Sequence, residues 1–392
     1  MSNKDKKNTY SSEILTGYAK WIFSSSVFYL FFIGALGFFF RFYVFPYEIP
    51  ITLDGLLYFW YAIDMRDLGT IPADYMFPNN FWSLLISFFF SLSNSNNYLD
   101  YMYLQRFLSI IISTITIIPA YFLFRKFFVK PYSLIGAALF IFEPRIIQNS
   151  VSGLTEPLFI LLGVSSLLLF LNERMKIVYL SFVLFGLFAL VRYEGLLLVI
   201  PISIIFFIRY RNDKKVVLKY ALCISIFILV LLPMAYIRIQ TTGTDGLTSH
   251  IIGGINVATN EIIGDNPIGK FSLKDGLFTF GKLFSWSTFP IYFLFIPIGT
   301  ILILKNKTWK NYMIVICCIV LLLPSLYAFS RGFEETKYLL IITPFFSLIS
   351  LFSIQYFYQK SKKNSFFVLL LIGIVVSSFL FLIWKTDNQY ER

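Results

Sequence analysis

The sequence of 392 residues contains little charge, one histidine and three cysteines. Charged residues make up 14% of the chain, against roughly 25% in soluble domains, so polar side chains are too few to cover a soluble core of this size. The cysteines all lie inside apolar runs and form no CxxC pair, which argues against a disulfide framework or a cysteine-ligated metal. Neither GxGxxG nor GxxxxGK[ST] occurs, so no nucleotide-binding domain is indicated.

Apolar and aromatic residues take the place of the missing charges. Hydrophobic residues make up 57% of the chain, with 47 Phe and 25 Tyr. Phe suits lipid-facing helices, and Tyr and Trp favour the membrane–water boundary. The net charge of +12 is carried by short clusters between apolar runs, an arrangement that encodes topology and meets anionic lipid headgroups. We therefore expect a single integral membrane domain over residues 1–392, with membrane lipids and no nucleic acid as partners.

The apolar runs predict an all-α, polytopic bundle with about eleven crossings, since about 20 apolar residues span the hydrocarbon. The runs are 23–45, 103–124, 133–150, 154–171, 177–191, 193–208, 216–239, 288–304, 311–329, 337–358 and 365–384. Basic clusters flank them at 4–20, 125–130, 174–176, 209–215, 305–310 and 360–363. The positive-inside rule places all six clusters in the cytoplasm, so an even number of crossings must separate neighbouring clusters.

Eleven crossings satisfy this parity on two conditions. The short apolar stretch 80–93 must lie in the interface or re-enter the membrane instead of spanning it. The stretch 177–208 must be a helical hairpin that turns at 192–195. Each arm of that hairpin is short, which requires tilt or local thinning of the bilayer.

The same topology gathers the polar stretches on one side of the membrane. The first outer loop is 46–102, with interfacial helices, and the others are the loop at 240–287 and the turn at 330–336. The N-terminus, which is polar as far as Lys20, is predicted to be cytoplasmic without a cleavable signal peptide. The C-terminus is predicted to lie outside the cell membrane.

The first outer loop begins with an acidic residue on an aromatic helix. Asp54 and Tyr58 are one helical turn apart, and Thr52 or Asp54 can cap the helix. Such a helix lies in the interface plane and would hold Asp54 at the mouth of the bundle. An alternative explains Asp54 equally well: its side chain only caps the helix and faces water. For the charges at 64–67, a solvated cluster is the better explanation.

Two short outer turns carry further charges. Thr155-Glu156-Pro157 has the ordinary signals of a helix start, which explain it fully, although Glu156 remains available to a cation or a hydroxyl. Arg192 and Glu194 lie between two apolar arms, where ionisable residues are costly and are therefore candidates for function. The alternative is a turn that neutralises its own charges.

The late outer stretches add His250 and a charged tract at 331–338. A loop as long as the one that contains His250 is often a functional lid, although a lone His in a polar loop is usually solvated. In the tract, Arg331 offers a bidentate fork and Lys337 a point charge for a phosphate at the membrane surface. Local pairing of these two cations with Glu334 and Glu335 is the alternative.

In their order and common outward side, these tracts resemble the membrane-embedded glycosyltransferases of the C-type fold, which include protein O-mannosyltransferases and lipid A aminoarabinose transferases. The resemblance covers roughly residues 25–350. Its tracts are Asp54-Gly-Leu-Leu-Tyr58, Arg125-Lys126-Phe127-Phe128 with Leu139-Phe140 and Pro144-Arg145, Thr155-Glu-Pro-Leu-Phe159, Arg192-Tyr-Glu-Gly195, and Lys337-Tyr-Leu-Leu340 with Pro344. Many relatives carry Asp-Glu where this chain has Asp54-Gly55, which leaves a second carboxylate in question.

The resemblance implies a hexosyltransferase that takes its sugar from a polyprenyl-phosphate donor and passes it to an acceptor glycan, lipid or protein. It also implies that Asp54 is catalytic. A lipid phosphate is already a good leaving group, so the site must supply a base for the acceptor hydroxyl and positive charge for the phosphate. Asp54 fits the base of an inverting displacement. The candidates for the phosphate are Arg331, Lys337 and Arg192, and those for a supporting or acceptor-binding role are Tyr58, Glu156, Glu194 and His250.

Two other functions remain as alternatives. A transporter or a flippase for lipid-linked glycans predicts charges or broken helices at mid-membrane and often inverted repeats, which the sequence does not clearly show. A polysaccharide polymerase or ligase would depend on His250 and Arg331 instead of Asp54. No cofactor is certain, and a divalent cation with oxygen ligands from Asp54 and either Glu156 or Asp64 stays open.

Overall fold

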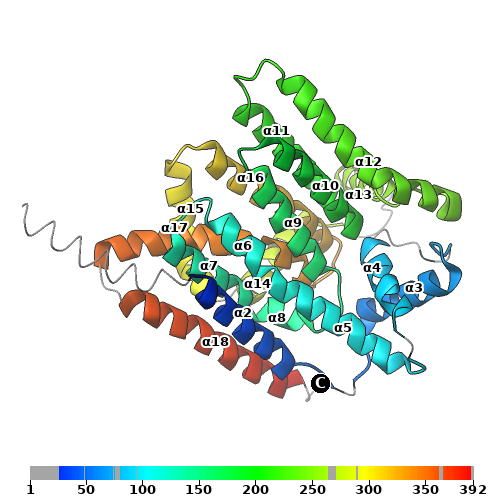
Figure 1. The fold of residues 1–392 in the computed structure, drawn as a ribbon, viewed down its shortest axis with the longest axis horizontal. Coiled ribbons are helices and arrows are strands. Elements are labelled where there is room, and N and C mark those ends of the chain that lie inside the picture. The colour runs from blue at the N-terminus through cyan, green and yellow to red at the C-terminus, as the bar shows by residue number, and fades with distance from the viewer. Residues whose placement is uncertain are drawn as a thin grey trace, which may run out of the picture.

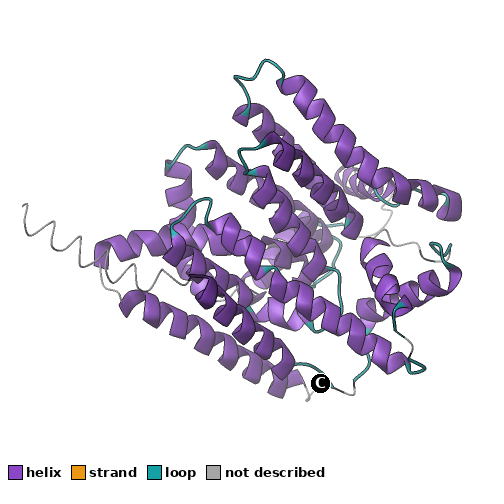
Figure 2. Cartoon of the chain, viewed as in Figure 1, coloured by secondary structure: helices purple, strands orange, loops and turns teal. Residues whose placement is uncertain are grey.

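The computed structural model of the chain describes residues 26–47, 49–73, 75, 80–93, 95–263, 271–287, 290–361 and 365–389. Within these residues all regular structure is helical (Figures 1 and 2), so the predicted all-α class is confirmed. The first half of the described chain contains α2 (Ser26–Tyr43), α3 (Leu53–Leu68), α4 (Asn80–Ser91), α5 (Tyr98–Ile115), α6 (Ile117–Phe124), α7 (Lys130–Ile141), α8 (Pro144–Ser150), α9 (Glu156–Phe170) and α10 (Met175–Val191).

The second half begins with a 3-10 helix and contains another one before its last two α-helices. Its elements are η1 (Tyr193–Leu198), α11 (Val199–Arg209), α12 (Val216–Thr242), α13 (Thr248–Ile263), α14 (Leu273–Ser287), α15 (Pro290–Lys305), α16 (Trp309–Ser330), η2 (Thr336–Ile342), α17 (Thr343–Ser361) and α18 (Ser365–Gln389). The 3-10 segments η1 and η2 each lead directly into an α-helix, and both carry charged residues of the predicted site.

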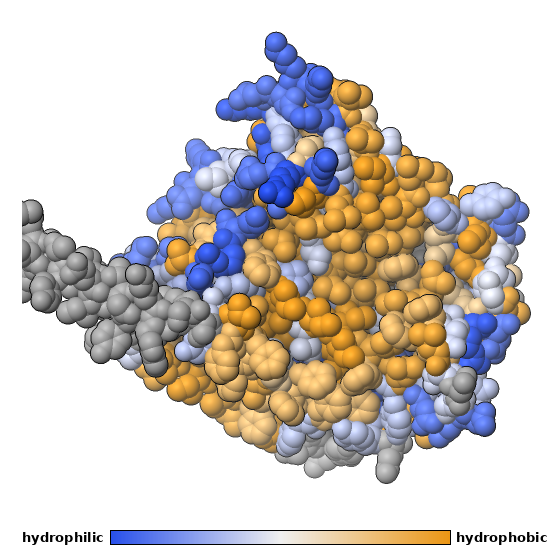
Figure 3. Space-filling view, in the orientation of Figure 1, coloured by the Kyte–Doolittle hydropathy of each residue, from blue (hydrophilic) through white to orange (hydrophobic). Residues whose placement is uncertain are grey.

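The helices form a multi-pass membrane bundle. Within the described residues, six are long and apolar enough to cross a membrane: Ser26–Tyr43, Tyr98–Phe124, Val216–Thr242, Trp309–Ser330, Thr336–Lys360 and Ser365–Ile383. Shorter apolar helices lie among them. Figure 3 shows a broad apolar surface between polar edges, as expected where lipid tails cover the protein. The total of eleven crossings and the sides on which the termini lie stay predictions.

One predicted crossing is wrong as a single helix. The stretch 133–150 is divided between α7, which ends at Ile141, and α8, which begins at Pro144. Proline cannot continue a helix because it lacks the N–H and clashes with the preceding turn. The Glu143 side chain caps the new helix by accepting a hydrogen bond from the Ile146 backbone N–H at 2.9 Å. The short helix α8 therefore starts within the bundle and carries Arg145.

The expected turn at 192–195 is present. Helix α10 ends at Val191, and η1 follows Arg192 directly. A side chain at Gly195 would begin 2.8 Å from the Phe188 ring, so the turn packs closely enough to need a glycine. The Phe188 ring in turn stacks on Phe159 of α9, with centroids 3.9 Å apart and planes inclined by 3°. This packing fixes Arg192 beside the first turn of α9.

The first outer loop folds as the helix pair α3 and α4, which lie against each other at one end of the bundle (Figure 1). Helix α4 covers most of the apolar stretch 80–93. Its 12 residues extend only about 18 Å at 1.5 Å per residue, which is too short for the hydrocarbon core. Instead it buries Trp82, Ile86 and Phe90 against the rest of the protein.

Candidate functional site

The start of α3 is held in a constrained position. Thr52 precedes the helix in an extended conformation, without a capping hydrogen bond from its side chain. Leu53 has a φ of 51°, which is costly for a bulky residue and is typical of functional sites. The buried Gln105 side chain donates hydrogen bonds to the Gly55 carbonyl at 3.0 Å and to the Gly153 carbonyl at 2.7 Å. These bonds fasten the turn around Asp54 to the loop before α9.

Gly55 follows Asp54 at a point where α3 packs closely on the neighbouring loop. A Cβ atom at this position would lie 2.5 Å from the Ile51 side chain and 2.6 Å from the backbone oxygen of Ser152. Real Cβ atoms do not approach backbone atoms so closely. The close approach of α3 to the loop at Ser152 therefore requires glycine, and it leaves Asp54 without an acidic neighbour in the chain.

Asp54 meets a lysine from the opposite end of the sequence. The Lys337 ammonium contacts the Asp54 carboxylate, and it also lies 2.5 Å from the Glu335 carboxylate. The side chain of Lys337 is mostly buried, at 15% exposure, whereas that of Asp54 is 42% exposed. The carboxylate thus lies at the border between solvent and the protein interior, with its cation on the inner side.

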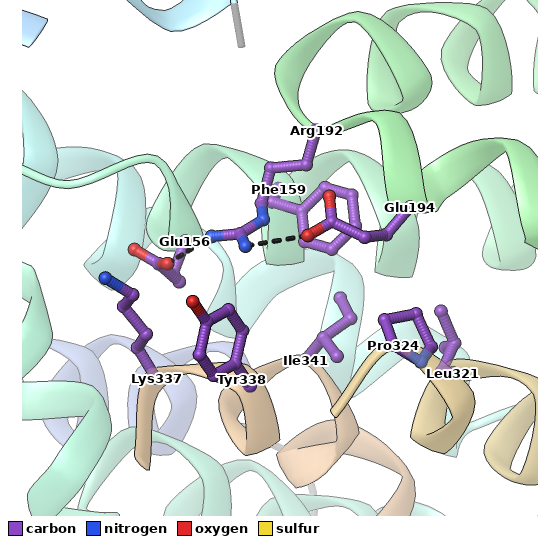
Figure 4. A pocket seen from close by; sticks show the side chains of 9 residues that line it. All are labelled: Glu156, Phe159, Arg192, Glu194, Leu321, Pro324, Lys337, Tyr338 and Ile341. Carbon is purple, nitrogen blue, oxygen red and sulfur yellow. Dashed lines mark hydrogen bonds and ion pairs between the residues drawn. The ribbon is translucent and has the colours of Figure 1, made fainter. Parts of the chain in front are cut away.

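On one side of Lys337 lies a small compartment of about 20 Å³, which we call the inner cavity. Figure 4 shows its charged and aromatic lining, which is Glu156, Phe159, Arg192, Glu194, Lys337 and Tyr338. Arg192 lies between two carboxylates, 2.5 Å from Glu156 and 2.9 Å from Glu194. Burial alone would lower the pKa of Arg192, but Glu194 and Glu156 hold this pKa well above its ordinary value.

On the other side of Lys337 lies a larger compartment of about 410 Å³, which we call the basic cavity. The charged side chains that line it are Arg106, Arg145 and Lys337, and all three are cationic. Arg106 is already used by the fold, because it donates to the backbone oxygens of Ile49 at 2.5 Å and of Pro50 at 3.1 Å. It therefore shapes the chain that leads into α3.

Arg145 has unused hydrogen-bonding capacity in the wall of the basic cavity. The residue is only 6% exposed, and its guanidinium stacks at 5.0 Å on the Phe381 ring. One Nη atom donates to Gln148 at 3.3 Å. Its Nε and its other Nη have no hydrogen-bond partner among the described residues. Since buried donors are nearly always paired in native proteins, these two nitrogens need an acceptor, and an anion in the basic cavity would supply one.

The remaining sequence-predicted residues are placed around the two cavities. Tyr58 is buried and lies close enough to Arg192 to contribute to the raised pKa of that residue. His250 in α13 packs against Tyr193, with ring centroids 5.4 Å apart, at the rim of η1. Arg331 follows the last residue of α16 and lines neither cavity.

The charged tract at 331–338 forms ion pairs, but with partners other than those the sequence suggested. Lys337 pairs with Glu335 and Asp54 instead of Glu334. Glu334 lies 3.1 Å from Lys282 of α14. In the first outer loop, Arg66 pairs with Asp67 at 2.7 Å, as expected of a solvated cluster.

The donor set does not fit a divalent cation. The carboxylates that would have to bind one are held by cations of the chain: Lys337 contacts Asp54, and Arg192 contacts Glu156. Asp64, the other candidate ligand, accepts a hydrogen bond from the Tyr75 hydroxyl at 2.7 Å. Among the described residues, no three Asp, Glu, His or Cys side chains form a group that could hold a metal ion.

No family model and no curated protein matches the sequence, but solved structures match the fold. The Archaeoglobus fulgidus oligosaccharyltransferase in complex with zinc and sulfate has a TM-score of 0.63 at 16% identity, over 90% of this chain and 52% of its own. Its complex with an inhibitory peptide and a dolichol-phosphate gives 0.62 at 15% identity, over 93% and 55%. This chain thus spans about half the length of the archaeal protein.

A bacterial structure matches over a larger share of its own length. ArnT from Cupriavidus metallidurans bound to undecaprenyl phosphate has a TM-score of 0.63 at 12% identity. The match covers 92% of this chain and 71% of ArnT. Both proteins are glycosyltransferases of the C-type fold. The chain therefore has the fold of the C-type membrane glycosyltransferases.

Proposed function

We propose that the chain is a membrane glycosyltransferase that moves a sugar from a polyprenyl-phosphate donor to an acceptor hydroxyl on the extracytoplasmic side. The observation that carries the proposal is the contact between Asp54 and Lys337 at the border of a cavity lined by three cations. It places a carboxylate next to positive charge, in a fold whose solved examples contain a dolichol-phosphate and undecaprenyl phosphate. The acceptor is a glycan, a lipid or a protein.

In this reaction Asp54 acts as the base. Its carboxylate accepts the proton of the acceptor hydroxyl while the hydroxyl oxygen forms a bond to the anomeric carbon of the sugar. The bond from that carbon to the phosphate oxygen breaks, and the polyprenyl phosphate leaves with the electron pair. A single displacement of this kind inverts the anomeric configuration. Gly55 leaves no second carboxylate next to Asp54 along the chain.

The departing phosphate needs positive charge that is already in place. Lys337 supplies an ammonium from η2. Arg145 supplies a guanidinium from α8, and two of its donor nitrogens have no partner within the described ranges. Arg192, which the sequence also suggested for the phosphate, has its guanidinium engaged by Glu156 and Glu194. We therefore assign the phosphate to the basic cavity. Arg192 pairs with the carboxylates of the inner cavity and has a structural role there.

The test is sugar transfer in proteoliposomes from radiolabelled polyprenyl-phosphate sugars. Asp54→Asn is expected to lower turnover by about 100-fold or more, the scale of losing a positioned base. Asp67→Asn is the matched control, because Asp67 belongs to the same helix but is 56% exposed and paired with Arg66. Wild-type rates from Asp54→Asn at equal membrane abundance would overturn the proposal, as would an equal loss from both variants.

A further inference from the structure

A groove outside the candidate site opens on the surface of the bundle between α15, α17 and α18, at one edge of the molecule (Figure 1). Its volume is about 570 Å³, and we call it the lateral groove. Helices α17 and α18 belong to segments that are long and apolar enough to cross a membrane, and α15 is a shorter apolar helix. The groove therefore faces lipid tails. Its lining is Leu294, Phe295 and Ile298 from α15, Phe357 and Lys360 from α17, and Phe366 from α18.

Close packing between α15 and α17 forms the floor of the lateral groove. The rings of Phe295 and Phe357 meet edge to face, with centroids 6.0 Å apart and planes inclined by 61°. The Ser353 hydroxyl donates a hydrogen bond to the Phe295 carbonyl. A Cβ atom at Gly299 would lie 2.2 Å from the Ile349 backbone oxygen, so only glycine allows the two helices to approach so closely. The groove is therefore a fixed depression in the bundle.

Positive charge gathers at one end of the lateral groove. Lys360 is exposed, and its Nζ lies 4.8 Å from the centre of the Tyr356 ring. Lys305, the last residue of α15, lies close enough to Tyr356 to interact electrostatically with it. Neither lysine forms a salt bridge with another described residue. Residues 276–333 and 336–386 contain no Asp or Glu, so the sequence around the groove offers these cations no carboxylate.

This combination of apolar walls and cations without a counterion fits an anionic phospholipid. The walls gain contacts from an acyl chain, which a soluble phosphate does not have. Basic pockets between transmembrane helices bind the headgroups of anionic lipids, whereas a zwitterionic headgroup brings its own ammonium towards the lysines. The positive-inside rule assigns the end of the groove that carries the basic clusters 305–310 and 360–363 to the cytoplasmic leaflet.

We propose that the lateral groove is a binding site for one anionic phospholipid of the cytoplasmic leaflet. An acyl chain lies along Leu294, Ile298 and Phe366, and the phosphate lies near Lys305 and Lys360. No residue lines both the lateral groove and the basic cavity. The site is therefore separate from the one that we assign to the donor, and it does not depend on the proposed function.

The experiment counts the lipids bound to the purified protein by native mass spectrometry, during titration with phosphatidylglycerol or with phosphatidylcholine of the same acyl chains. Wild type should bind the first phosphatidylglycerol at least about 10-fold more tightly than phosphatidylcholine, as expected of two lysines beside one headgroup. Lys360→Gln should lower this preference by about 5-fold, the scale of one lysine near an anionic headgroup. Soluble glycerol phosphate should not displace the lipid.

Lys214→Gln is the matched control for the charge. Lys214 is exposed and belongs to another basic cluster that is predicted to be cytoplasmic, at 209–215, but it does not line the lateral groove. Its substitution removes the same charge from the same side of the membrane and should leave the preference for phosphatidylglycerol unchanged.

Leu294→Trp tests the apolar part of the site. The larger side chain should occupy the groove and weaken the binding of both lipids by about 10-fold, the scale of two CH₂ groups that leave an apolar surface. Leu369→Trp is the matched control, because Leu369 is exposed to a similar degree on α18 and lies outside the groove. It should bind both lipids as wild type does.

Several outcomes would overturn the inference. Equal affinity of wild type for the two lipids would show ordinary contact with the bilayer, as would a preference that survives substitution of both Lys305 and Lys360 by Gln. Displacement by glycerol phosphate would show a phosphate site without a lipid. Polyprenyl phosphate held more tightly than phosphatidylglycerol, or a second copy of the chain whose binding Leu294→Trp removes, would identify a different occupant. The proposed function is tested separately by sugar transfer.

Discussion

The two cavities beside Lys337 differ in how their arginines are paired. In the inner cavity, Arg192 is held by two carboxylates within 2.9 Å. In the basic cavity, Arg145 is equally well buried, yet two of its donor nitrogens have no partner in the described part of the chain. A buried arginine is therefore not by itself evidence of an anion site. The partners decide, because a paired guanidinium organises the protein and an unpaired one is available to a ligand.

Substitution of the residue shared by both cavities tests the comparison most severely. Lys337 is the cation next to Asp54 and lines both compartments. Lys337→Gln should lower kcat/KM for transfer by about 100-fold, the scale of losing one group that stabilises developing negative charge. Steady-state transfer assays at equal membrane abundance measure it.

Lys282→Gln is the matched control for that variant, because Lys282 is exposed and its partner Glu334 lies outside both cavities. It should retain wild-type kcat/KM. If kcat/KM of Lys337→Gln falls by less than about 10-fold, the Lys337 ammonium does not stabilise the departing phosphate.

A smaller effect should distinguish the two cavities from each other. Arg145→Gln removes a charge-assisted contact to phosphate, so the affinity for bare polyprenyl phosphate should fall by about 10-fold. Binding of polyprenyl phosphate to the purified protein in nanodiscs measures this affinity.

Arg331→Gln provides the comparison for Arg145→Gln. Arg331 was a candidate from the sequence, but it lines neither cavity, so this variant should change donor affinity by less than about 2-fold. The reverse order of effects would move the phosphate site to the end of α16.

Several residues of the site could be identified from the sequence because charges at the edge of a membrane bundle are costly and few. Arg192 and Glu194 were singled out in this way, whereas Asp54 was singled out by the resemblance and Lys337 as a cation suited to a phosphate. The contact between Asp54 and Lys337 could not be found, because it joins residues 283 positions apart and depends on how the helices pack. The fold class followed from the apolar runs.

Arg145 could not be recognised as a site residue from the apolar run that contains it. It lay inside a predicted crossing at 133–150, and it entered the sequence interpretation only through the Pro144-Arg145 tract of the resemblance. The local clue was Pro144, which ends a helix and, with the cap from Glu143, starts α8 in the wall of the basic cavity. The missing partners of Arg145 can be recognised only in three dimensions.

The position of Asp54 between the cavities depends on Gly55. Gly55→Ala places a Cβ atom 2.6 Å from the Ser152 backbone oxygen, so α3 must shift or the contact must open. We expect a loss of about 1–3 kcal/mol in stability, as for other overpacked sites, with a lower kcat as Asp54 moves. Thermal unfolding and transfer assays measure the two effects.

Gly69→Ala serves as a control for glycine removal in the same helix. This residue ends α3 with a φ of 68° and has open space around its Cβ position, so its substitution strains the backbone without shifting the helix start. It should lower stability by about 1 kcal/mol and leave kcat unchanged. Unchanged kcat in Gly55→Ala would show that Asp54 tolerates movement of α3.

The smallest expected effect concerns the start of η1, where His250 packs on Tyr193. Burial lowers the pKa of His250 below its ordinary 6.5, and the nearby Arg238 lowers it further, although Asp245 and Glu194 oppose the shift. The folded chain thus prefers the neutral imidazole. As the pH falls through 6.5, the unfolded chain takes up this proton first, so the folded state loses stability.

His250→Gln should remove that loss, because glutamine does not titrate. The melting temperature of wild type should fall between pH 7.5 and pH 5.5 by of the order of 1 °C more than that of His250→Gln, with the two curves meeting at the higher pH. Parallel curves would mean that the imidazole titrates alike in the folded and unfolded chains. A positive charge at His250 would then be tolerated beside Glu194.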